Sequence, residues 1–476
     1  MTQLRKNIGY SGISQFLYTV LAFILVPFAA RYLDKQEYGI YSLAAAIGFF
    51  ISLLSDFGLT TLMTRQVSRN KMIAPAFFAE TIGLRFYLII FSLLVFVPYL
   101  LLSHLNAVSL QAVIIFVMAS LLGSFSQSTF GIFRGFEKMQ FESVSVFIEK
   151  ALSVALGIII LLIGGDVRAF LISFLIAGLL RLFYSLWVVH KRFFPIKVSF
   201  HFKRSRVLWL NATPFGISVF LAVCYNYVDI LMLSAMKSFE DVAIYSAGHR
   251  LLTLTSVVPA LLVNAFFPKL AVYHQDPPKL SHYFFKGCKL LFLFSLPMIP
   301  FILLFADPIV AIVFGSTFSG SVWVVQVLAF AAFAQMLNTF FVPLFVSVNR
   351  QKKIVFFQLG GLLMNIVLNA ALIPHYTYKG ATIATVATEA TILLLILHHV
   401  HAHIFSLDQI LGRAARSLGK ICAAVLAMLM VALAFKQVVD SFWLNALVSV
   451  IAYGLALQIS GSLDFIRLFK WMLKWD

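Results

Sequence analysis

Apolar runs of about 20 residues recur along the whole chain and are separated by short polar segments. An α-helix of that length crosses the hydrocarbon core of a bilayer, which is about 30 Å thick. The ten-residue alternation that marks a membrane-spanning β-barrel is absent from the sequence. The pattern therefore predicts an all-α polytopic membrane protein with about 14 transmembrane helices. They are expected at residues 9–32, 38–62, 76–101, 108–132, 142–163, 168–189, 208–235, 241–267, 285–305, 321–347, 353–373, 379–402, 417–435 and 441–460.

The amino-acid composition indicates the same class of protein. Of the 476 residues, 61% are hydrophobic and 11% are charged, whereas a soluble domain has about 25% charged residues. A chain this apolar lacks the polar side chains to cover its own surface in water. The three cysteines, Cys224, Cys288 and Cys422, lie far apart within apolar segments. They therefore indicate neither a disulfide framework nor a metal-binding spacing.

The basic residues are distributed unevenly between the two sides that these helices define. If the amino terminus is cytoplasmic, most lysines and arginines fall in cytoplasmic segments, as the positive-inside rule requires. We therefore expect an even number of helices and both termini in the cytoplasm. These loops also explain most of the +18 net charge, and their nearest partner is anionic lipid rather than nucleic acid. The outer segments carry Arg31, Lys35, Arg168, Lys237, Lys379 and Lys436.

A weak internal repeat divides the chain. Residues 12–14 and 40–42 recur as residues 216–218 and 244–246, in register and without an insertion. Chance similarity between apolar segments is the alternative explanation. A repeat of this length favours two six-helix lobes in parallel repeat around a central cavity, followed by two extra C-terminal helices. The expected divisions are an N-lobe at 1–190, a basic cytoplasmic linker at 191–206, a C-lobe at 207–403, and helices 13–14 with a cytoplasmic tail at 404–476.

Four basic residues lie inside predicted spans rather than in loops, namely Arg85, Lys150, Arg181 and Arg250. A charge at the middle of a bilayer costs about 2.5–3.5 kcal/mol on insertion scales, so each needs an acidic partner or a water-filled cavity. Arg181 lies near the cytoplasmic end of its helix, and we expect its side chain to reach the headgroups. The other three are candidates for holding an anionic group of a substrate.

Acidic residues inside the spans are fewer. Glu149, Asp229 and Glu389 lie within predicted helices, and Asp56 lies near the inner end of the second helix. Asp229 and Arg250 occupy the outer halves of consecutive antiparallel helices, where an ion pair could form. Two interpretations stay open. The charges form structural pairs between helices, or they line a polar cavity where cations hold an anion and Asp229, Glu389 and Asp56 bind coupling ions.

The sequence carries no recognisable catalytic constellation. There is no phosphate-binding glycine-rich loop, no nucleophile elbow and no soluble domain large enough for a nucleotide. We therefore expect a protein that is not an enzyme, uses no cofactor, and is driven by an ion gradient, the membrane potential or the substrate gradient. Four clustered histidines have spacings that could form a metal-binding face, although solvated interfacial side chains are the simpler interpretation. They are His398, His399, His401 and His403.

Several short motifs resemble those of one transporter family. They are Pro27 with Arg31-Tyr32-Leu33, Glu37-Tyr38-Gly39-Ile40-Tyr41, Asp56-Phe57-Gly58, Arg65, Gly131-Ile132-Phe133-Arg134-Gly135, and Ile244-Tyr245-Ser246-Ala247 with Arg250. The first of these resemble the opening of bacterial oligosaccharide (O-antigen type) flippases. The later two resemble the inner end of their fourth helix and the start of their eighth. These flippases belong to the multidrug/oligosaccharidyl-lipid/polysaccharide exporter superfamily, and the similarity spans helices 1–12.

This resemblance implies two lobes that alternate between inward- and outward-facing states. The implied substrate is an undecaprenyl-pyrophosphate-linked glycan, such as an O-antigen repeat unit of lipopolysaccharide. It would be turned from the cytoplasmic to the outer leaflet of the bacterial inner membrane. The implied partners are membrane lipids, a polysaccharide polymerase and a chain-length regulator. Cationic cavities are a family property, and the corresponding candidates here for substrate binding are Arg85, Arg250, Lys150 and Arg65.

Three other functions stay open. A cation-expelling multidrug antiporter of the same fold would have carboxylates dominating its cavity, and twelve helices would suffice for it. A membrane-embedded glycosyltransferase or ligase would need a sizeable outer loop with carboxylates, arginine or histidine, whereas the outer loops here are short and nearly uncharged. A scaffold in a polysaccharide assembly complex is the third. Fourteen helices also resemble the lipid II flippase, but that chain carries more arginine in its first two helices, so lipid II is not assigned.

Overall fold

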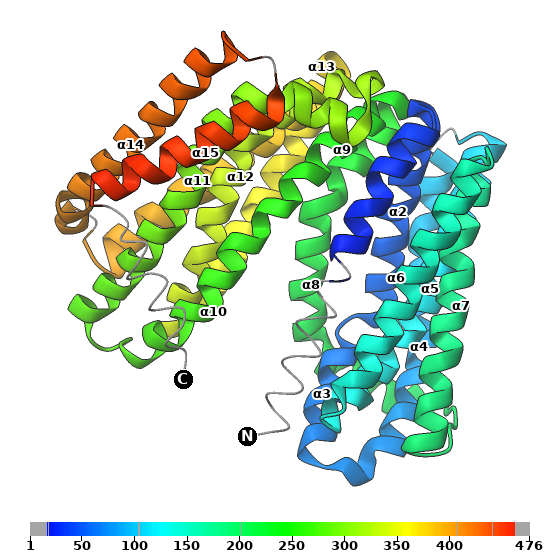
Figure 1. The fold of residues 1–476 in the computed structure, drawn as a ribbon. Helices are drawn as coiled ribbons and strands as arrows, with labels where there is room; N and C mark the ends of the chain where they lie inside the picture. The colour runs from blue at the N-terminus through cyan, green and yellow to red at the C-terminus, as the bar shows by residue number, and fades with distance from the viewer. Residues whose placement is uncertain are drawn as a thin grey trace. The chain divides into compact units, whose positions relative to one another are not determined.

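The computed structural model describes residues 17, 19–102, 105–200, 202–406, 408–439 and 441–461. Throughout these residues the chain is helical apart from turns and one extended linker, and it contains no strand there (Figure 1). The all-α membrane fold expected from the apolar runs is confirmed. The start of the predicted first helix and the tail at residues 462–476 lie outside the described part.

All fourteen predicted helices have a counterpart in the structure. In the described part, 12 helical segments are long and apolar enough to cross a membrane, and a shorter apolar helix, Thr19–Tyr32, precedes them. One of these segments, α13, holds two predicted spans. A kink separates them, where the backbone leaves the helical conformation at Thr377 (φ 51°, ψ −134°). The long helices are α2 (Lys35–Asp56), α3 (Leu59–Arg69), α4 (Ala74–Leu102), α5 (Ala107–Gly135), α6 (Met139–Leu162), α7 (Val167–Arg192), α8 (Phe202–Met236), α9 (Phe239–Thr253), α10 (Val257–Val272), α11 (Pro277–Phe314), α12 (Gly320–Ser347), α13 (Gln351–His403), α14 (Asp408–Lys436) and α15 (Phe442–Ile459).

Two predicted helices are broken and one is longer than its apolar run. The second predicted helix ends as α2 at Asp56 and resumes as α3 at Leu59. The eighth is divided into α9 and α10 by one turn of 3-10 helix, Leu254–Ser256. The ninth, α11, continues to Phe314 through Pro308. A proline inside a helix removes one backbone hydrogen bond and bends the helix without having to end it.

The chain divides into two compact units. Unit 1 comprises Met1–Ser246, Val313–Thr317 and Ile373–Tyr378, and unit 2 comprises Ala247–Ile312, Phe318–Leu372 and Lys379–Asp476. This division reflects which residues pack together, whereas the predicted lobes rest on a sequence repeat and on topology. The lobe boundaries at 190 and 207 therefore stay a prediction.

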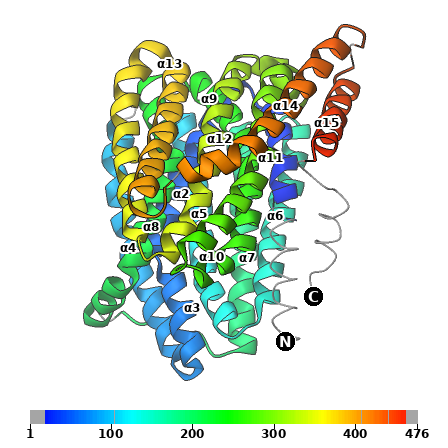
Figure 2. The same cartoon turned by 90° about the vertical axis from the view of Figure 1, so that its left-hand side faces the viewer.

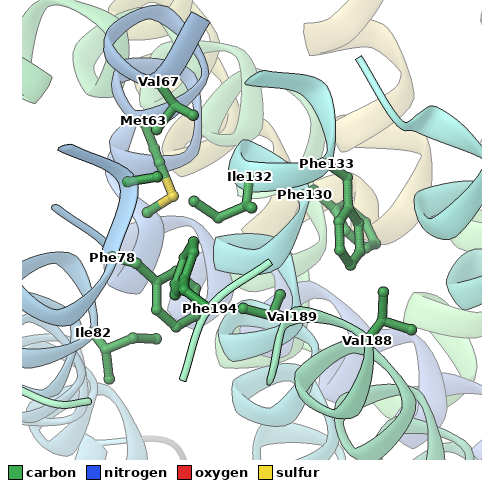
Figure 3. Packing of buried hydrophobic residues seen from close by; sticks show 11 residues of the cluster. Met63, Val67, Phe78, Ile82, Phe130, Ile132, Phe133, Val188, Val189 and Phe194 are labelled. Carbon is green, nitrogen blue, oxygen red and sulfur yellow. The ribbon is translucent and has the colours of Figure 1, made fainter. Parts of the chain in front are cut away.

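In unit 1, α5 packs against α2, α3 and α7. Gly131 and Gly135, one turn apart on α5, face Met63 and Val67 of α3, and a Cβ at position 131 would lie 2.9 Å from that of Met63. Small residues let two helix backbones approach closely. Met63, Val67 and the neighbouring Ile132 are fully buried at this contact (Figure 3).

The linker between α7 and α8 is extended and packs against α4. The backbone N–H of Ser199 donates to the carbonyl oxygen of Ala79 at 3.1 Å. Gly83 leaves room for the linker, because a side chain there would overlap the carbonyl oxygen of Ser199. Phe200 contacts Phe86 with ring centroids 5.7 Å apart. The linker that joins α7 to α8 is therefore held against α4 within unit 1.

In unit 2 the last two helices form a hairpin, visible in Figures 1 and 2 as neighbouring α14 and α15. Leu293 of α11, Ile421 of α14 and Leu457 of α15 share a buried apolar cluster. The hydroxyl of Tyr453 donates to the carbonyl oxygen of Leu293 at 2.8 Å. The appended helices are thus joined to the rest of unit 2 through α11.

Candidate functional site

The Asp56-Phe57-Gly58 motif forms the break between α2 and α3. Phe57 and Gly58 both have left-handed backbone (φ 35° and 83°), a conformation that glycine adopts without strain. Position 58 also needs glycine because a Cβ there would lie 2.8 Å from the carbonyl oxygen of Ala212 on α8. Asp56 supports the start of α3, since its Oδ1 accepts from the backbone N–H of Thr60 at 3.3 Å and from the Thr60 hydroxyl.

Arg85 on α4 joins this break to α5. Its Nη2 donates to Asp56 Oδ1, and its Nη1 donates to the backbone oxygen and the hydroxyl of Ser124, the latter at 2.6 Å. The Arg85 side chain is 0% exposed and that of Asp56 is 15% exposed. An arginine cannot shed its charge in a protein, so its burial here depends on the carboxylate. Arg85 was expected to bind substrate and Asp56 a coupling ion, and the structure brings the two together as one ion pair.

A second ion pair joins α6 to α7. Arg181 donates through Nη1 to Glu149, and its guanidinium lies over the Phe130 ring, 4.9 Å from the centroid. The expectation that Arg181 reaches the headgroups is wrong, because the residue is only 7% exposed and its charge is matched within the helix bundle. The sequence offered no simple partner for Glu149, because the residue beside it, Lys150, points in a different direction.

Both guanidinium groups lie beside the same stretch of α5. Arg85 binds Ser124, and a Cβ on the neighbouring Gly123 would lie 3.9 Å from Arg181 Nη1. The stretch is polar although it lies in the middle of an apolar helix, and several of its side chains are fully buried: Ser124, Ser126, Ser128 and Thr129. The polar run is visible in the sequence and marks the part of α5 that Arg85 contacts.

Asp229 on α8 is paired with a tyrosine. Its Oδ2 accepts from the hydroxyl of Tyr245 on α9 at 2.5 Å, and both residues are buried. Tyr245 lies in the repeated triplet 244–246, and Tyr41 is its counterpart in the first copy. Both tyrosines are the seventh residue of their helix, α9 and α2, so the repeat keeps its register in the structure. Sequence reasoning considered only Arg250 as a partner of Asp229 and missed Tyr245.

Glu389, in the second half of α13, contacts α12. Asn338 Nδ2 donates to Glu389 Oε2 at 2.8 Å and to its backbone oxygen at 3.2 Å. Glu389 is 3% exposed, so this amide replaces part of its hydration. One turn apart on the first half of α13, Asn369 donates to Asn365 at 2.9 Å. Unit 2 therefore contains two buried polar contacts, one of which involves a proposed coupling carboxylate, Glu389.

The other proposed substrate-binding residues lie at less buried positions. Arg65 on α3 is exposed, with its guanidinium 5.4 Å from the centre of the Phe215 ring. Lys150 and Arg250 are half-buried. Arg65 and Lys150 belong to unit 1 and Arg250 to unit 2. The substrate-binding role of these residues and of Arg85, and the ion-coupling role of Asp229, Glu389 and Asp56, stay predictions.

Three of the four clustered histidines, His398, His401 and His403, are exposed, as expected for solvated interfacial side chains, and His399 is the exception. His399 is buried between the rings of Phe345 and His403, and its Nε2 lies 3.3 Å from Arg350 Nη1. A ring nitrogen that faces an arginine is a hydrogen-bond acceptor rather than a metal ligand. Among the residues that the structure describes, no group of three or more His, Cys, Asp or Glu side chains is placed to hold a metal ion.

Two family models match the chain. One, described as polysaccharide biosynthesis protein, matches residues 4–274, which is more than half of the sequence. The other, described as MatE, matches residues 214–371. The two matches overlap at the helices that hold Asp229, Tyr245 and Arg250.

Curated proteins similar to this chain include transporters of glycans. The probable low-salt glycan biosynthesis flippase Agl15 of Haloferax volcanii is 22% identical over 409 residues, which cover 84% of each chain. The succinoglycan biosynthesis transport protein ExoT of Rhizobium meliloti is 24% identical over 65% of this chain and 62% of its own. A putative O-antigen transporter of Shigella dysenteriae is 24% identical over 56% of this chain and 67% of its own.

Solved structures show the same fold. The lipid II flippase MurJ in an inward closed conformation matches with a TM-score of 0.77 and 16% identity, over 97% of this chain and 100% of its own. An inward-facing multidrug resistance MATE family transporter of the MOP superfamily matches with a TM-score of 0.61 and 17% identity, over 82% and 95%. At this level of identity the likeness concerns the fold alone.

Proposed function

The chain belongs to the polysaccharide biosynthesis protein family, and we propose that it moves an undecaprenyl-pyrophosphate-linked glycan from the cytoplasmic to the outer leaflet of the inner membrane. The resemblance to polysaccharide flippases of the MOP superfamily is confirmed by the family match and by the flippases and transporters among its relatives. These relatives are transporters rather than enzymes, which supports a role without catalysis. The glycan itself, an O-antigen or another surface polysaccharide repeat unit, is part of the proposal.

The observation that carries the proposal is the buried Arg85–Asp56 pair at the break between α2 and α3. Guanidinium binds carboxylate and phosphate through the same parallel N–H donors. Asp56 occupies Nη2, one of the donors that a pyrophosphate would need, and the two anions therefore compete for one cation. Arg85 Nε has no hydrogen-bond partner within the described residues, so one donor remains available when an anion approaches.

This competition supplies a route for ion coupling. A proton that binds the Asp56 carboxylate removes its negative charge, which weakens its hold on Arg85 and frees the guanidinium for the pyrophosphate. Loss of the proton restores the pair and expels the anion. Asp229, hydrogen-bonded to Tyr245, and Glu389, hydrogen-bonded to Asn338, are further buried carboxylates that can bind a coupling ion.

The remaining parts of the proposal concern access and partners. Two six-helix lobes alternate between inward- and outward-facing states, with both chain ends in the cytoplasm. Arg65, Lys150 and Arg250 supply further positive charge to the bound anion. A polysaccharide polymerase and a chain-length regulator take the glycan after it reaches the outer leaflet, since flipping alone leaves single repeat units there.

Single substitutions test the role of the ion pair in vesicles that contain the purified protein and a fluorescent lipid-linked oligosaccharide. Arg85→Ala should slow flipping by about tenfold or more, because one charge-assisted contact to the pyrophosphate is lost. Asp56→Asn should flip without responding to a pH gradient. Arg168→Ala is the matched control, because this arginine has a 43% exposed side chain in the first turn of α7, where it contacts Asp166 and Gln111. Wild-type flipping by Arg85→Ala would remove Arg85 from the site.

A multidrug cation antiporter of the same fold is the second candidate. The MatE match to residues 214–371 and the fold of the MATE transporter favour it. Against it, Asp56 and Glu149 are each neutralised by an arginine, whereas a site for organic cations needs carboxylates with unmatched charge. Deleting the gene separates the two functions. A flippase mutant accumulates one lipid-linked saccharide on the inner leaflet, and an antiporter mutant becomes sensitive to cationic drugs.

A further inference from the structure

Two short segments from the second half of the chain belong to unit 1, although the helices on either side of them belong to unit 2. Residues 313–317 lie at the connection between α11 and α12, and residues 373–378 contain the kink of α13. Each has a residue with positive φ, Gly315 at 90° and Thr377 at 51°. The bias of basic residues predicts that both lie on the outer side of the membrane.

The first segment packs on the start of α2. The ring of Phe314 meets the ring of Tyr38 edge to face, with centroids 6.4 Å apart and planes at 80°. Both side chains are 0% exposed, so the contact excludes water. The next residue, Gly315, lies beside Arg31, whose Cγ would be 3.9 Å from a Cβ at position 315. Edge-to-face aromatic contacts are specific in geometry and contain no covalent or charged link that would make them permanent.

The second segment is held by a lysine from the turn after α8. Lys237 Nζ donates to the carbonyl oxygen of Pro374 at 2.8 Å. In an uninterrupted helix this oxygen would accept from the backbone N–H four residues later. The non-helical backbone at Thr377 interrupts that ladder, and the ammonium group supplies a hydrogen-bond donor at the kink.

The start of α9, two residues after Lys237, is itself seated on α2. The carbonyl oxygen of Phe239 lies so close to Gly39 that any side chain at position 39 would overlap it. Gly39 is next to Tyr38, so one turn of α2 contacts both the connection 313–317 and the start of α9. Within unit 1, two distant parts of the sequence therefore contact the start of α2, and a third, residues 373–378, is bound to Lys237.

We propose that these contacts form a clasp, in which residues 313–317 and 373–378 are seated on Tyr38 and Lys237, and that the clasp opens each time the lipid-linked glycan is released on the outer side. The proposal rests on the proposed function, because release is the step that requires opening. The contacts suit a reversible closure. One is a dry aromatic contact, one is a single hydrogen bond at a partly exposed position, and neither involves a buried ion pair.

Cross-linking tests the clasp directly. The three native cysteines are replaced by alanine, and cysteine pairs are introduced as Tyr38→Cys with Phe314→Cys and, separately, Lys237→Cys with Pro374→Cys. The second pair keeps the test valid if the first pair disturbs folding, since position 237 is half-buried and position 374 is exposed. A short bifunctional methanethiosulfonate should link each pair and reduce flipping in vesicles at least about tenfold. A reductant should restore it.

The outcomes separate the clasp from the proposed function. If the cysteine-free parent does not flip lipid-linked oligosaccharide, the function fails, whereas efficient linking of the pairs would still support the contacts. If the parent flips and linked protein flips equally well, or if neither pair can be linked, the clasp is overturned. Single-cysteine variants show that the reagent alone has no effect.

A wedge provides a second, independent measurement. Gly39→Ala should push the start of α9 away from α2 and increase labelling of Phe314→Cys by a membrane-impermeant maleimide about threefold or more, because residue 314 is then less well covered at the start of α2. Gly360→Ala is the matched control, since it adds the same methyl group within a helix but meets no atom within 4 Å. Equal labelling in the two backgrounds would contradict the clasp.

Discussion

The buried pair of Arg85 and Asp56 should show an unequal cost when its two members are removed one at a time. Asp56→Asn keeps a hydrogen-bond acceptor of the same size but leaves a 0% exposed guanidinium without a counter-ion. Because arginine cannot neutralise itself, this variant should lose about 3–5 kcal/mol of unfolding free energy, the cost of breaking a buried pair.

The reverse substitution should be milder. Arg85→Met leaves Asp56 15% exposed and still hydrogen-bonded by Thr60, and a carboxylate can take up a proton when its counter-ion is gone. We expect a loss of about 1–2 kcal/mol. In the double variant neither charge remains, so its cost should fall short of the sum of the single costs by about 2 kcal/mol or more.

Equilibrium unfolding in detergent micelles at neutral pH measures all three variants against the wild type. The surface pair Arg134–Glu142 is the control, because Arg134 is 43% exposed although its Nε lies 2.8 Å from the carboxylate. Removing either member of that pair should cost about 0.2–1 kcal/mol. The reasoning is refuted if Arg85→Met costs as much as Asp56→Asn, or if the two costs simply add.

Three further predictions concern local structure. Asp166 accepts from the backbone N–H of Ala169 at 3.0 Å, and this hydrogen bond is the main cause that lowers the pKa of the carboxyl. Asp166→Asn should therefore have a lower unfolding free energy than the wild type at neutral pH, and this difference should shrink in acid. The stabilisation by the carboxylate is present above the unfolded pKa of about 3.9 and is lost as pH falls through the lower folded pKa. A difference in unfolding free energy that stays unchanged down to about pH 2 would contradict this. Asp166→Ala should cost about 1 kcal/mol of unfolding free energy through loss of the helix cap, and chemical denaturation checks it. Gly131→Ala should cost about 1–3 kcal/mol of unfolding free energy, because the new methyl would lie 2.9 Å from Met63 Cβ. Gly360→Ala is the control and should be neutral or stabilising by up to about 1 kcal/mol. Equal thermal stability of the two variants would contradict this prediction and show that α3 shifts to admit the methyl group.

The sequence was sufficient for the helices because a span needs about 20 apolar residues whatever it packs against. It was insufficient for the breaks within them. The interruption at Phe57 and Gly58 depends on the close approach of Gly58 to Ala212 on α8, which no local pattern records. The kink at Thr377 lies between two predicted spans, so its position was expected although its unusual backbone was not.

The candidate charges were visible in the sequence, but their partners were not. Arg85 and Asp56 are 29 residues apart in the sequence, and Arg181 and Glu149 are 32 apart. Which residues pair depends on how the helices pack. The cost of placing a charged side chain in the bilayer indicates only that some partner must exist. Reading Arg85 and Asp56 as separate sites followed from that limit. The ion pair turns them into two parts of one proposed exchange between carboxylate and pyrophosphate.

Flipping of a lipid-linked oligosaccharide by the purified protein tests the central claim most directly. Vesicles are prepared with a fluorescent undecaprenyl-pyrophosphate-linked oligosaccharide, and a membrane-impermeant reagent quenches the outer leaflet. Without protein about half of the fluorescence should stay protected, since flip-flop of a pyrophosphate headgroup is slow. With the protein, the protected fraction should fall well below half within minutes, and Arg85→Ala should slow that fall. A protected fraction that stays at half with folded wild-type protein, at either polarity of the pH gradient, would contradict the account.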